Sequence, residues 1–302
     1  MTHNLVIVRG GGDIATGVTW ALRNAGFDVL ILESESPSAI RTAVSFSEAV
    51  YAGESTVEGM RCVREENFAA ALDRLRQDGL ALLIDPCADT VRYFSAKSGW
   101  RLGEFHLVAL VDAVIAKKNM GTGMEMAPFV AALGPGFTAG EDCDMVIETM
   151  RGHSLGRLIL AGTALPDTGI PGTIAGHSRD RVLHAPADGV LRQIAHIGDV
   201  VEKDSAIAEI TSENGERTAV RATFTGLLRG LIHEGYRVKK GMKIADIDPR
   251  TEERENCFSI SDKSRSLGGA ALLAVMMSVS GQYRRLPEEN RKDKTGSCAE
   301  WE

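Results

Sequence analysis

The stretch LVIVRGGGDIATG, residues 5–17, joins an apolar strand to a glycine loop and then to the start of a helix. Gly10, Gly12 and Ala15 stand at the G-x-G-x-x-G/A positions. There the first glycine permits a tight turn, the second lets backbone approach a pyrophosphate, and the third small residue lets helix and strand pack closely. The helix N-terminus offers N–H groups and the positive end of a dipole to an anion. The pattern therefore predicts a nucleotide-binding turn.

The residues that follow fit the same unit. Apolar residues recur at helical spacing as far as Gly26, and residues 29–33, VLILE, predict a second buried strand. Glu33 ends that strand about 20 residues after the glycines, the separation at which an acidic side chain meets a ribose hydroxyl. Asp13 could serve a ligand or cap the helix. The alternative interpretation is a scaffold of this kind without a ligand, because fold does not imply function.

Composition limits the class of protein. The chain has 302 residues, of which 44% are hydrophobic and 25% charged, as in soluble globular proteins, and its length allows two domains. A net charge of −7 and a pI near 5.6 argue against binding to nucleic acid or to an anionic membrane. The N-terminus shows no signal-peptide pattern, and the apolar run at residues 270–279 is too short to span a bilayer. We expect a cytoplasmic protein.

Five cysteines are scattered along the chain, with no C-x-x-C pair. This pattern favours reduced thiols over a disulfide framework or a zinc site, and we predict no metal site. Cys87 follows a strand that ends at residue 85, and Cys143 stands between two aspartates, so either thiol is a candidate for sulfur or selenium chemistry. Neighbouring carboxylates should raise the pKa of Cys143, which weakens its case as a thiolate.

Helix and strand patterns continue to alternate after the first unit. Apolar runs predict strands at the positions 80–85, 106–112, 145–148 and 158–160, and helical spacing predicts a helix that ends near Gly79. In open α/β sheets ligands gather where the glycine-bearing loops meet at the strand ends. We therefore expect a Rossmann-like α/β domain over residues 1–165.

An internal repeat follows a stretch rich in proline and glycine. HAPADGVL at 184–191 aligns with RATFTGLL at 221–228, an offset of 37, and the register holds without a gap. Neither half could bury its apolar face alone, so the two should share one core. The pattern resembles the barrel-sandwich of biotinyl and lipoyl carrier domains and implies a small all-β domain over residues 181–248. The join at 211–217 has no lysine, so we expect no biotin or lipoyl attachment and a structural or docking role.

The end of the chain divides into two predicted segments. Residues 262–281 carry apolar side chains at helical spacing and predict a C-terminal helix that packs back on the first domain. Residues 282–302 mix charges of both signs with few apolar residues, and we expect a disordered tail.

Three polar stretches in the middle of the chain add candidate binding residues: KKNMGTG at 117–123, LGPGFTAGEDCD at 133–144 and RGHSLGR at 151–157. Their glycines could let N–H groups line an anion site, and their cations could engage phosphate or carboxylate oxygens. Tight turns with solvated charges are the alternative. His153, near two acidic residues, is the best candidate for a general acid or base. The predicted binding residues are Gly10, Gly11, Gly12, Asp13, Ala15, Thr16, Glu33, Lys117, Gly121, Gly134, Gly136, Thr138, Arg151 and His153.

Several long motifs, in the same order, resemble the YqeB-type accessory proteins of selenium-dependent molybdenum hydroxylases, which are distantly similar to XdhC-type chaperones. They lie at 8–17, 111–113, 133–140, 148–153 and 166–172. The resemblance implies a maturation role, in which the protein holds, modifies or inserts a phosphorylated pterin. The molybdenum cofactor or a nucleotide would be the bound group, and a molybdenum hydroxylase apoenzyme the partner.

Two other functions stay open at this point. One is an NAD(P)- or nucleotide-dependent enzyme, against which stands the lack of a self-evident acid/base pair. The other is a non-catalytic docking scaffold with an empty nucleotide cleft. The partners expected are a phosphorylated small molecule and a protein, and the sequence leaves the formation of a homo-oligomer open.

Overall fold

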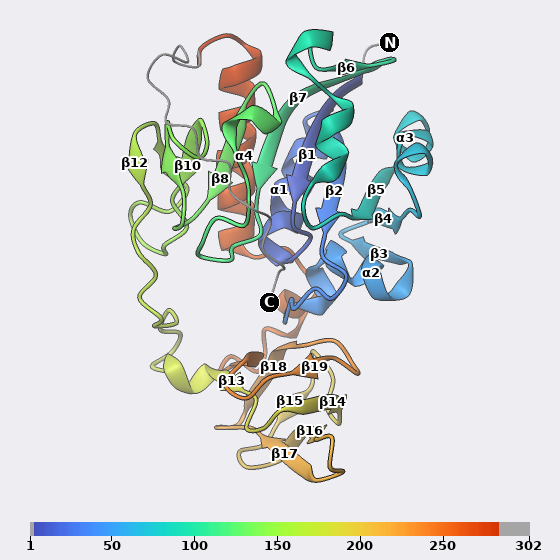
Figure 1. The fold of residues 1–302 in the computed structure, drawn as a ribbon. Coiled ribbons are helices and arrows are strands. Elements are labelled where there is room, and N and C mark those ends of the chain that lie inside the picture. Colours follow the sequence, from blue (N-terminus) through green and yellow to red (C-terminus); the bar gives the residue numbers. More distant parts are fainter. Residues whose placement is uncertain (1–2, 284–302) are drawn as a thin grey trace. The chain divides into compact units, whose positions relative to one another are not determined.

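The computed structural model describes residues 3–283, which form two compact units (Figure 1). Of the described residues, unit 1 comprises 3–37, 46–167 and 261–283, and unit 2 comprises 38–45 and 168–260. From residue 284 onward, the predicted disordered tail lies outside the described residues.

Unit 1 is built on a mixed sheet of ten strands in the order β11-β10-β8-β7-β1-β2-β5-β4-β3, with β6 paired to β7. The strands from β1 to β8, β10 and β11 are His3–Arg9, Asp28–Glu33, Glu54–Val57, Met60–Arg64, Leu80–Ile84, Arg101–Leu102, Phe105–Asp112, Val130–Leu133, Met145–Ile147 and Leu158–Ile159. The central pairs are parallel, whereas β3, β6 and β11 pair antiparallel to their neighbours. A separate small ribbon pairs β9, Thr138–Ala139, with β12, Gly162–Thr163.

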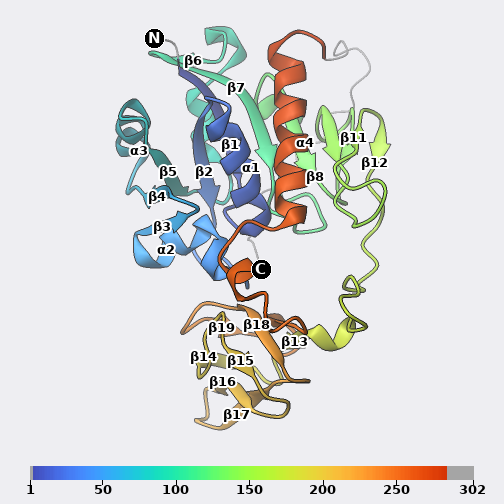
Figure 2. The same ribbon diagram turned by 180° about the vertical axis from the view of Figure 1, so that it is seen from behind.

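Helices cover the two faces of this sheet unequally. α1, Asp13–Asn24, and α4, Asp262–Val279, lie side by side on one face (Figure 2). α3, Phe68–Arg76, and a 3₁₀ segment, Asp89–Tyr93, contribute to a buried cluster on the other. Leu5 and Ile7 belong to that cluster because alternate residues of a strand share one face. α2, Ala49–Ala52, is a single turn.

The close packing of α1 on α4 depends on two glycines that face each other. A Cβ on Gly17 would lie 2.5 Å from the carbonyl oxygen of Ser264, and a Cβ on Gly268 would lie 2.3 Å from the carbonyl oxygen of Gly17. No side chain fits in this space. The last glycine of the opening motif therefore serves helix packing.

The predicted Rossmann-like α/β fold class is wrong. Such a domain carries a helix on each crossover between parallel strands, but the described residues contain four α-helices, and the sheet is mixed. The connection from β7 to β8 holds only a 3₁₀ turn, Met124–Met126. Gly121, Gly123 and Pro128 interrupt this segment, which explains why no helix forms there.

Unit 2 consists of two four-stranded antiparallel sheets, in the orders β13-β20-β18-β15 and β17-β16-β14-β19. The strands β13 to β20 are Val182–His184, Gly189–Gln193, Val200–Val201, Ala206–Thr211, Arg217–Arg221, Gly226–Leu231, Arg237–Val238 and Lys243–Asp248. Each sheet takes its two central strands from one half of the repeat and its two edge strands from the other. The barrel-sandwich classification predicted from the carrier-domain resemblance is corrected to this pair of separate sheets.

A short segment from early in the chain belongs to unit 2. Arg41 pairs with Leu231 in an isolated parallel bridge, and its guanidinium donates to the carbonyl of Asn256 at 2.9 Å. Thr42 donates to the carbonyl of Leu231 at 3.3 Å. Residues 38–45 therefore add hydrogen bonds to a unit whose other residues begin at 168.

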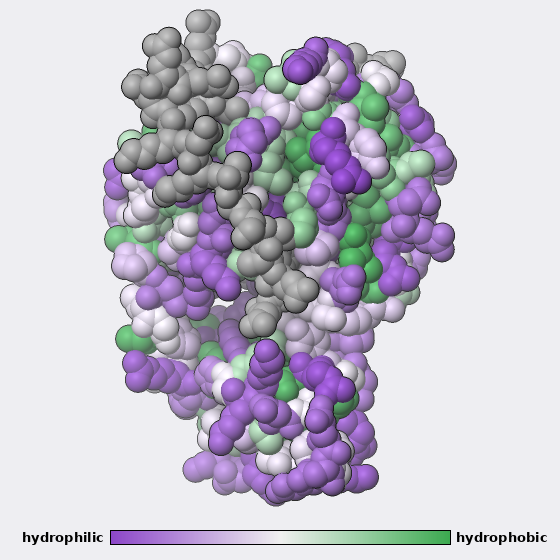
Figure 3. Space-filling model, viewed as in Figure 1, coloured by the Kyte–Doolittle hydropathy of each residue, from purple (hydrophilic) through white to green (hydrophobic). Residues whose placement is uncertain are grey.

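Hydrophilic residues cover much of the face seen in Figure 3, with smaller hydrophobic patches among them. Among residues 3–283, no helix has the length and hydropathy needed to cross a membrane.

Candidate functional site

The predicted binding loops meet at the carboxyl ends of the parallel strands in unit 1. β1 lies between β2 and β7, and the chain proceeds from β1 to β2 on one side and reaches β7 on the other only later. This reversal makes the gap between β1 and β7 a topological switch point, where open parallel sheets bind their ligands. We refer to this edge, with the loops 10–13, 113–118 and 134–136, as the switch-point site.

Gly10 and Gly11 bring the first loop against other parts of the chain. Gly10 has a φ of +92°, and a Cβ on it would lie 3.1 Å from the carbonyl oxygen of Ala113. Gly11 donates its N–H to Glu33 Oε2 at 2.6 Å and accepts from the Ser47 N–H at 2.8 Å. Both glycines therefore allow close approach of the chain to itself.

Glu33 holds the glycine loop in place. Its side chain is buried, with Oε2 accepting from Gly11 and Oε1 accepting from the Ser34 N–H at 2.7 Å. Burial raises the pKa of this carboxyl, and the two backbone hydrogen bonds oppose the rise. The carboxylate thus serves the backbone of its own loop, which differs from the ribose contact expected from the sequence.

The start of α1 remains suited to an anion. Gly12 is the N-cap residue with φ −64° and ψ 179°, and as a glycine it forms no side-chain cap. Thr16 is buried, donates to the carbonyl of Gly11 at 3.2 Å and accepts from the Phe46 N–H at 3.0 Å, and so belongs to the framework. Ala15 is buried and Asp13 is half-buried in the first turn. The first N–H groups of an uncapped helix can be satisfied by a ligand.

Arg9, which the sequence analysis missed, lies fully buried at the end of β1. Its guanidinium lies 3.5 Å from Asp112 and donates to the carbonyls of Pro86 at 2.7 Å and Met120 at 3.1 Å. It also donates to the hydroxyl of Thr122, which in turn donates to Asp112 at 2.6 Å. In the sequence Arg9 is only a charged residue at the end of an apolar run. The structure places it in register with Asp112 at the end of the neighbouring strand β7. The network fixes the segment after β7.

The loop after β7 contains backbone strain. Ile115 and Lys117 have φ values of 61° and 62°, in the left-handed region that β-branched side chains rarely adopt. Lys117 forms an ion pair with Asp167 at 2.7 Å, and Gly121 donates to Asn119 at 2.9 Å. Such strain persists only where the surroundings enforce it, and it clusters at functional sites.

The loop after β8 completes the site. Gly136, with a φ of +106°, would place a Cβ 2.6 Å from the Cα of Lys118, and Gly134 would place one 2.8 Å from the hydroxyl of Thr149. Thr138 lies further along and donates its N–H to Asp142 at 2.8 Å. The loops that start at residues 10, 113, 134 and 148 therefore contact one another in sequence along the carboxyl edge of the parallel strands.

Other predicted residues lie apart from a ligand position. Arg151 forms a two-pronged ion pair with Asp262, at 2.8 and 3.1 Å, and so ties its loop to the start of α4. His153 is exposed and has no hydrogen-bond or ion-pair partner within residues 3–283. Its role as an acid or base stays a prediction.

The candidate cysteines do not present free thiolates. Cys87 is disulfide-bonded, which corrects the expectation of reduced thiols throughout. Cys143 is fully buried, and burial, reinforced by Asp142 and Asp144, raises the pKa of its thiol. Within the described residues, no group of three or more His, Cys, Asp or Glu side chains could hold a metal ion.

Comparison with solved structures gives weak matches to proteins of the aspartoacylase and desuccinylase type. The ectoine utilization protein EutE (DoeB) from Ruegeria pomeroyi has 11% identity and a TM-score of 0.28, over 82% of this chain and 85% of that chain. A succinylglutamate desuccinylase from Silicibacter sp. TM1040 has 14% identity and a TM-score of 0.25, with the same coverage. These TM-scores carry no activity over to this chain.

The expected role in maturing a molybdenum hydroxylase finds no support in these matches, which are described as aspartoacylase-family and succinylglutamate desuccinylase proteins. The expectation of a molybdenum-cofactor accessory protein is corrected accordingly.

Sequence comparison gives a much closer match. No family model matches the chain. The uncharacterized protein YqeB of Escherichia coli (strain K12) is 44% identical over 275 residues, which are 91% of this chain and 48% of that protein. The chain thus spans about half the length of this relative, to which it is similar over most of its own length.

Proposed function

We propose that unit 1 binds a small molecule carrying a phosphate group at the switch-point site. The observation that carries the proposal is the loop after β7, in which Ile115 and Lys117 are held in the left-handed region beside the glycine loop. Strain at a switch point is better explained by a binding role than by folding alone.

The surrounding charges and donors support an anionic ligand. α1 begins at Asp13, its N-cap residue Gly12 forms no side-chain cap, and the helix dipole favours negative charge at this end. Lys118 is exposed and forms no ion pair within residues 3–283, whereas Lys117 is paired with Asp167. An uncapped helix end and an available ammonium together suit a phosphate group.

The test uses a substitution that should keep the fold and repel the anion. Gly12 has an extended backbone that any residue can adopt, and Asp is a preferred N-cap residue. We expect Gly12→Asp to leave the melting temperature unchanged or higher and to weaken binding of inorganic pyrophosphate by about tenfold, or about 1.4 kcal/mol. Isothermal titration with pyrophosphate measures the affinity.

Gly12→Asn is the matched control, since it caps the helix without a charge. It should bind pyrophosphate more tightly than Gly12→Asp. Lys118→Gln should also weaken binding, because it removes the ammonium. Equal affinity in the Asp and Asn variants, or no pyrophosphate binding by the unsubstituted protein, would refute the proposal.

A further inference from the structure

A cavity of about 470 Å³ lies beside β11, an edge strand of the ten-stranded sheet in unit 1. Three polar residues line it, Ser154, Arg157 and Thr163, together with the buried Glu148. The other lining residues are apolar and include Leu158, Leu160 and Leu165. Its volume is in the range of small-molecule sites, which are mostly apolar with a few polar groups that orient the ligand.

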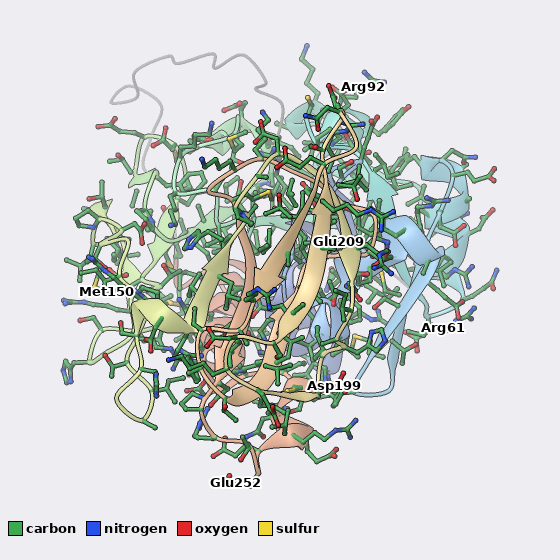
Figure 4. The ribbon with its side chains drawn as sticks, turned by 90° about the horizontal axis from the view of Figure 1, so that it is seen from below. Arg61, Arg92, Met150, Asp199, Glu209 and Glu252 are labelled. Atoms are coloured by element: carbon green, nitrogen blue, oxygen red, sulfur yellow. The ribbon has the colours of Figure 1, made fainter. Side chains whose placement is uncertain are left out.

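Glu148 gives this cavity a fixed frame. The residue is 3% exposed, and its carboxylate accepts from the N–H of Met150 at 2.7 Å and of Leu165 at 2.8 Å. Its backbone N–H donates to the carbonyl of Arg157 at 3.0 Å, and its carbonyl accepts from Gly156 at 2.8 Å. One side chain thus ties together the two chain segments that border the cavity. Met150 marks the first of these segments in Figure 4.

Arg157 supplies a cation to the cavity. Its side chain is exposed and makes no ion pair within the described part of the chain. Two other cations of the neighbouring loops are already engaged, Arg151 with Asp262 and Lys117 with Asp167. A guanidinium matches a carboxylate with two parallel hydrogen bonds, so an arginine that lines a largely apolar cavity and forms no ion pair within the described residues favours that group.

The walls define the rest of the ligand. Leu160 and Leu165 are 55% and 50% exposed although they border a concavity, so a ligand could remove their surface from water. Glu148 adds an acidic side chain to the lining, which disfavours a doubly charged phosphate more than a monoanion. A single guanidinium, two hydroxyls and apolar walls together suit a monoanion with an aliphatic chain.

We propose that this cavity binds a short aliphatic carboxylate, with the carboxylate on Arg157 and the chain against Leu158, Leu160 and Leu165. The site is separate from the switch-point site and does not depend on the proposed phosphate binding. Ser154 and Thr163 offer hydroxyl groups to the second carboxylate oxygen or to a polar group on the chain.

The experiment measures the affinity of the whole protein for hexanoate by isothermal titration, with hexylamine and acetate as comparison probes. We expect hexanoate to bind more tightly than either, because hexylamine lacks the anion and acetate lacks the chain. Affinity should rise by about three- to fourfold for each methylene from propionate to hexanoate. Equal affinity for acetate and hexanoate would overturn the apolar part of the proposal.

Variants separate the two recognition elements. Arg157→Gln should weaken hexanoate binding at least about tenfold, and Arg157→Lys should restore part of it, because an ammonium keeps the charge but not the paired hydrogen bonds. Arg101→Gln, at an exposed position in β6, is the matched control and should leave the affinity unchanged. Undetectable binding of hexanoate, or equal binding in Arg157→Gln, would refute the site.

Gly12→Asp distinguishes this inference from the proposed function. The substitution alters the switch-point site, so it should reduce pyrophosphate binding and leave hexanoate binding unchanged. Loss of both would show that the two ligands compete for one site, which would overturn the separate carboxylate site.

Discussion

Arg9 and Asp112 place opposite charges in the interior of unit 1, at the ends of two neighbouring strands. In Arg9→Met the Asp112 carboxylate would stay buried with two neutral donors, the Thr122 hydroxyl and the Val114 N–H. Removing one partner of a buried ion pair costs about 3–5 kcal/mol, so we expect the free energy of unfolding to fall by about that amount. Urea unfolding followed by circular dichroism measures the change.

The double variant Arg9→Met with Asp112→Leu is the control for this prediction. It removes both charges, and replacing a buried pair by apolar residues is often neutral. We expect it to recover much of the stability lost in the single variant. If the double variant is as unstable as Arg9→Met or less stable, the loss does not come from an uncompensated charge.

Glu33 gives a prediction of pH dependence. Its pKa in the folded protein lies above the ordinary value of 4.5, because burial opposes the charge. The folded state therefore binds more protons than the unfolded state just above pH 4.5, and the contribution of Glu33 to stability falls as the pH rises through that window. In Glu33→Gln this contribution is absent. The free energy of unfolding of the unsubstituted protein, minus that of the variant, should decrease from pH 4 upward, and an increase would contradict the prediction.

Single residues also show what the sequence could not reveal about the site. The glycine pattern identified the loop at residues 10–12, but the partners of that loop come from Glu33, Ser47 and Ala113. Arg9 meets Thr122, more than a hundred positions away, through no local pattern. Periodicity predicts which residues are buried, whereas contacts between distant loops depend on the completed fold.

The pairing of α1 and α4 allows a prediction about an element. In Gly268→Ala the new Cβ would meet the carbonyl oxygen of Gly17 at 2.3 Å, so the helices have to separate. Overpacking of this kind costs about 1–3 kcal/mol. We expect a lower melting temperature in thermal unfolding.

Gly269 is a matched control in the same helix. It is exposed, and a Cβ on it would meet nothing within 4 Å. Gly269→Ala should therefore stabilise the protein by about 0.5–1 kcal/mol through helix propensity alone. Similar destabilisation by both substitutions would show that the close approach of the helices is not the cause.

At the level of elements, the sequence predicted segments better than connections. The buried strands β1, β2, β5 and β7 follow apolar runs, and the strands β14 to β16 recur as β18 to β20 at the predicted offset. The fold class was wrong because strand patterns do not specify what joins the strands. Between β7 and β8 the chain uses loops fixed by Asn119 and Asp112, and side-chain hydrogen bonds of that kind leave no periodic signal.

The division of the molecule into two units leads to a prediction for the whole chain. Residues 38–45 belong to unit 2 although residues on either side of them belong to unit 1. The segment is polar and mixed in sequence, so periodicity could not assign it. Its hydrogen bonds to Leu231 and Asn256 imply that it should lose protection when unit 2 opens.

Hydrogen exchange with two core variants tests this assignment. Leu228 in unit 2 and Leu82 in unit 1 are both fully buried, and truncating either to Ala should cost about 2–5 kcal/mol. We expect Leu228→Ala to speed amide exchange at Val44 and Ser45, whose N–H groups bond within the segment, and to leave the β1 amides unchanged. Leu82→Ala should do the reverse. If exchange at Val44 and Ser45 follows Leu82→Ala instead, the segment is stabilised by unit 1, and the hydrogen bonds to unit 2 contribute little to its protection.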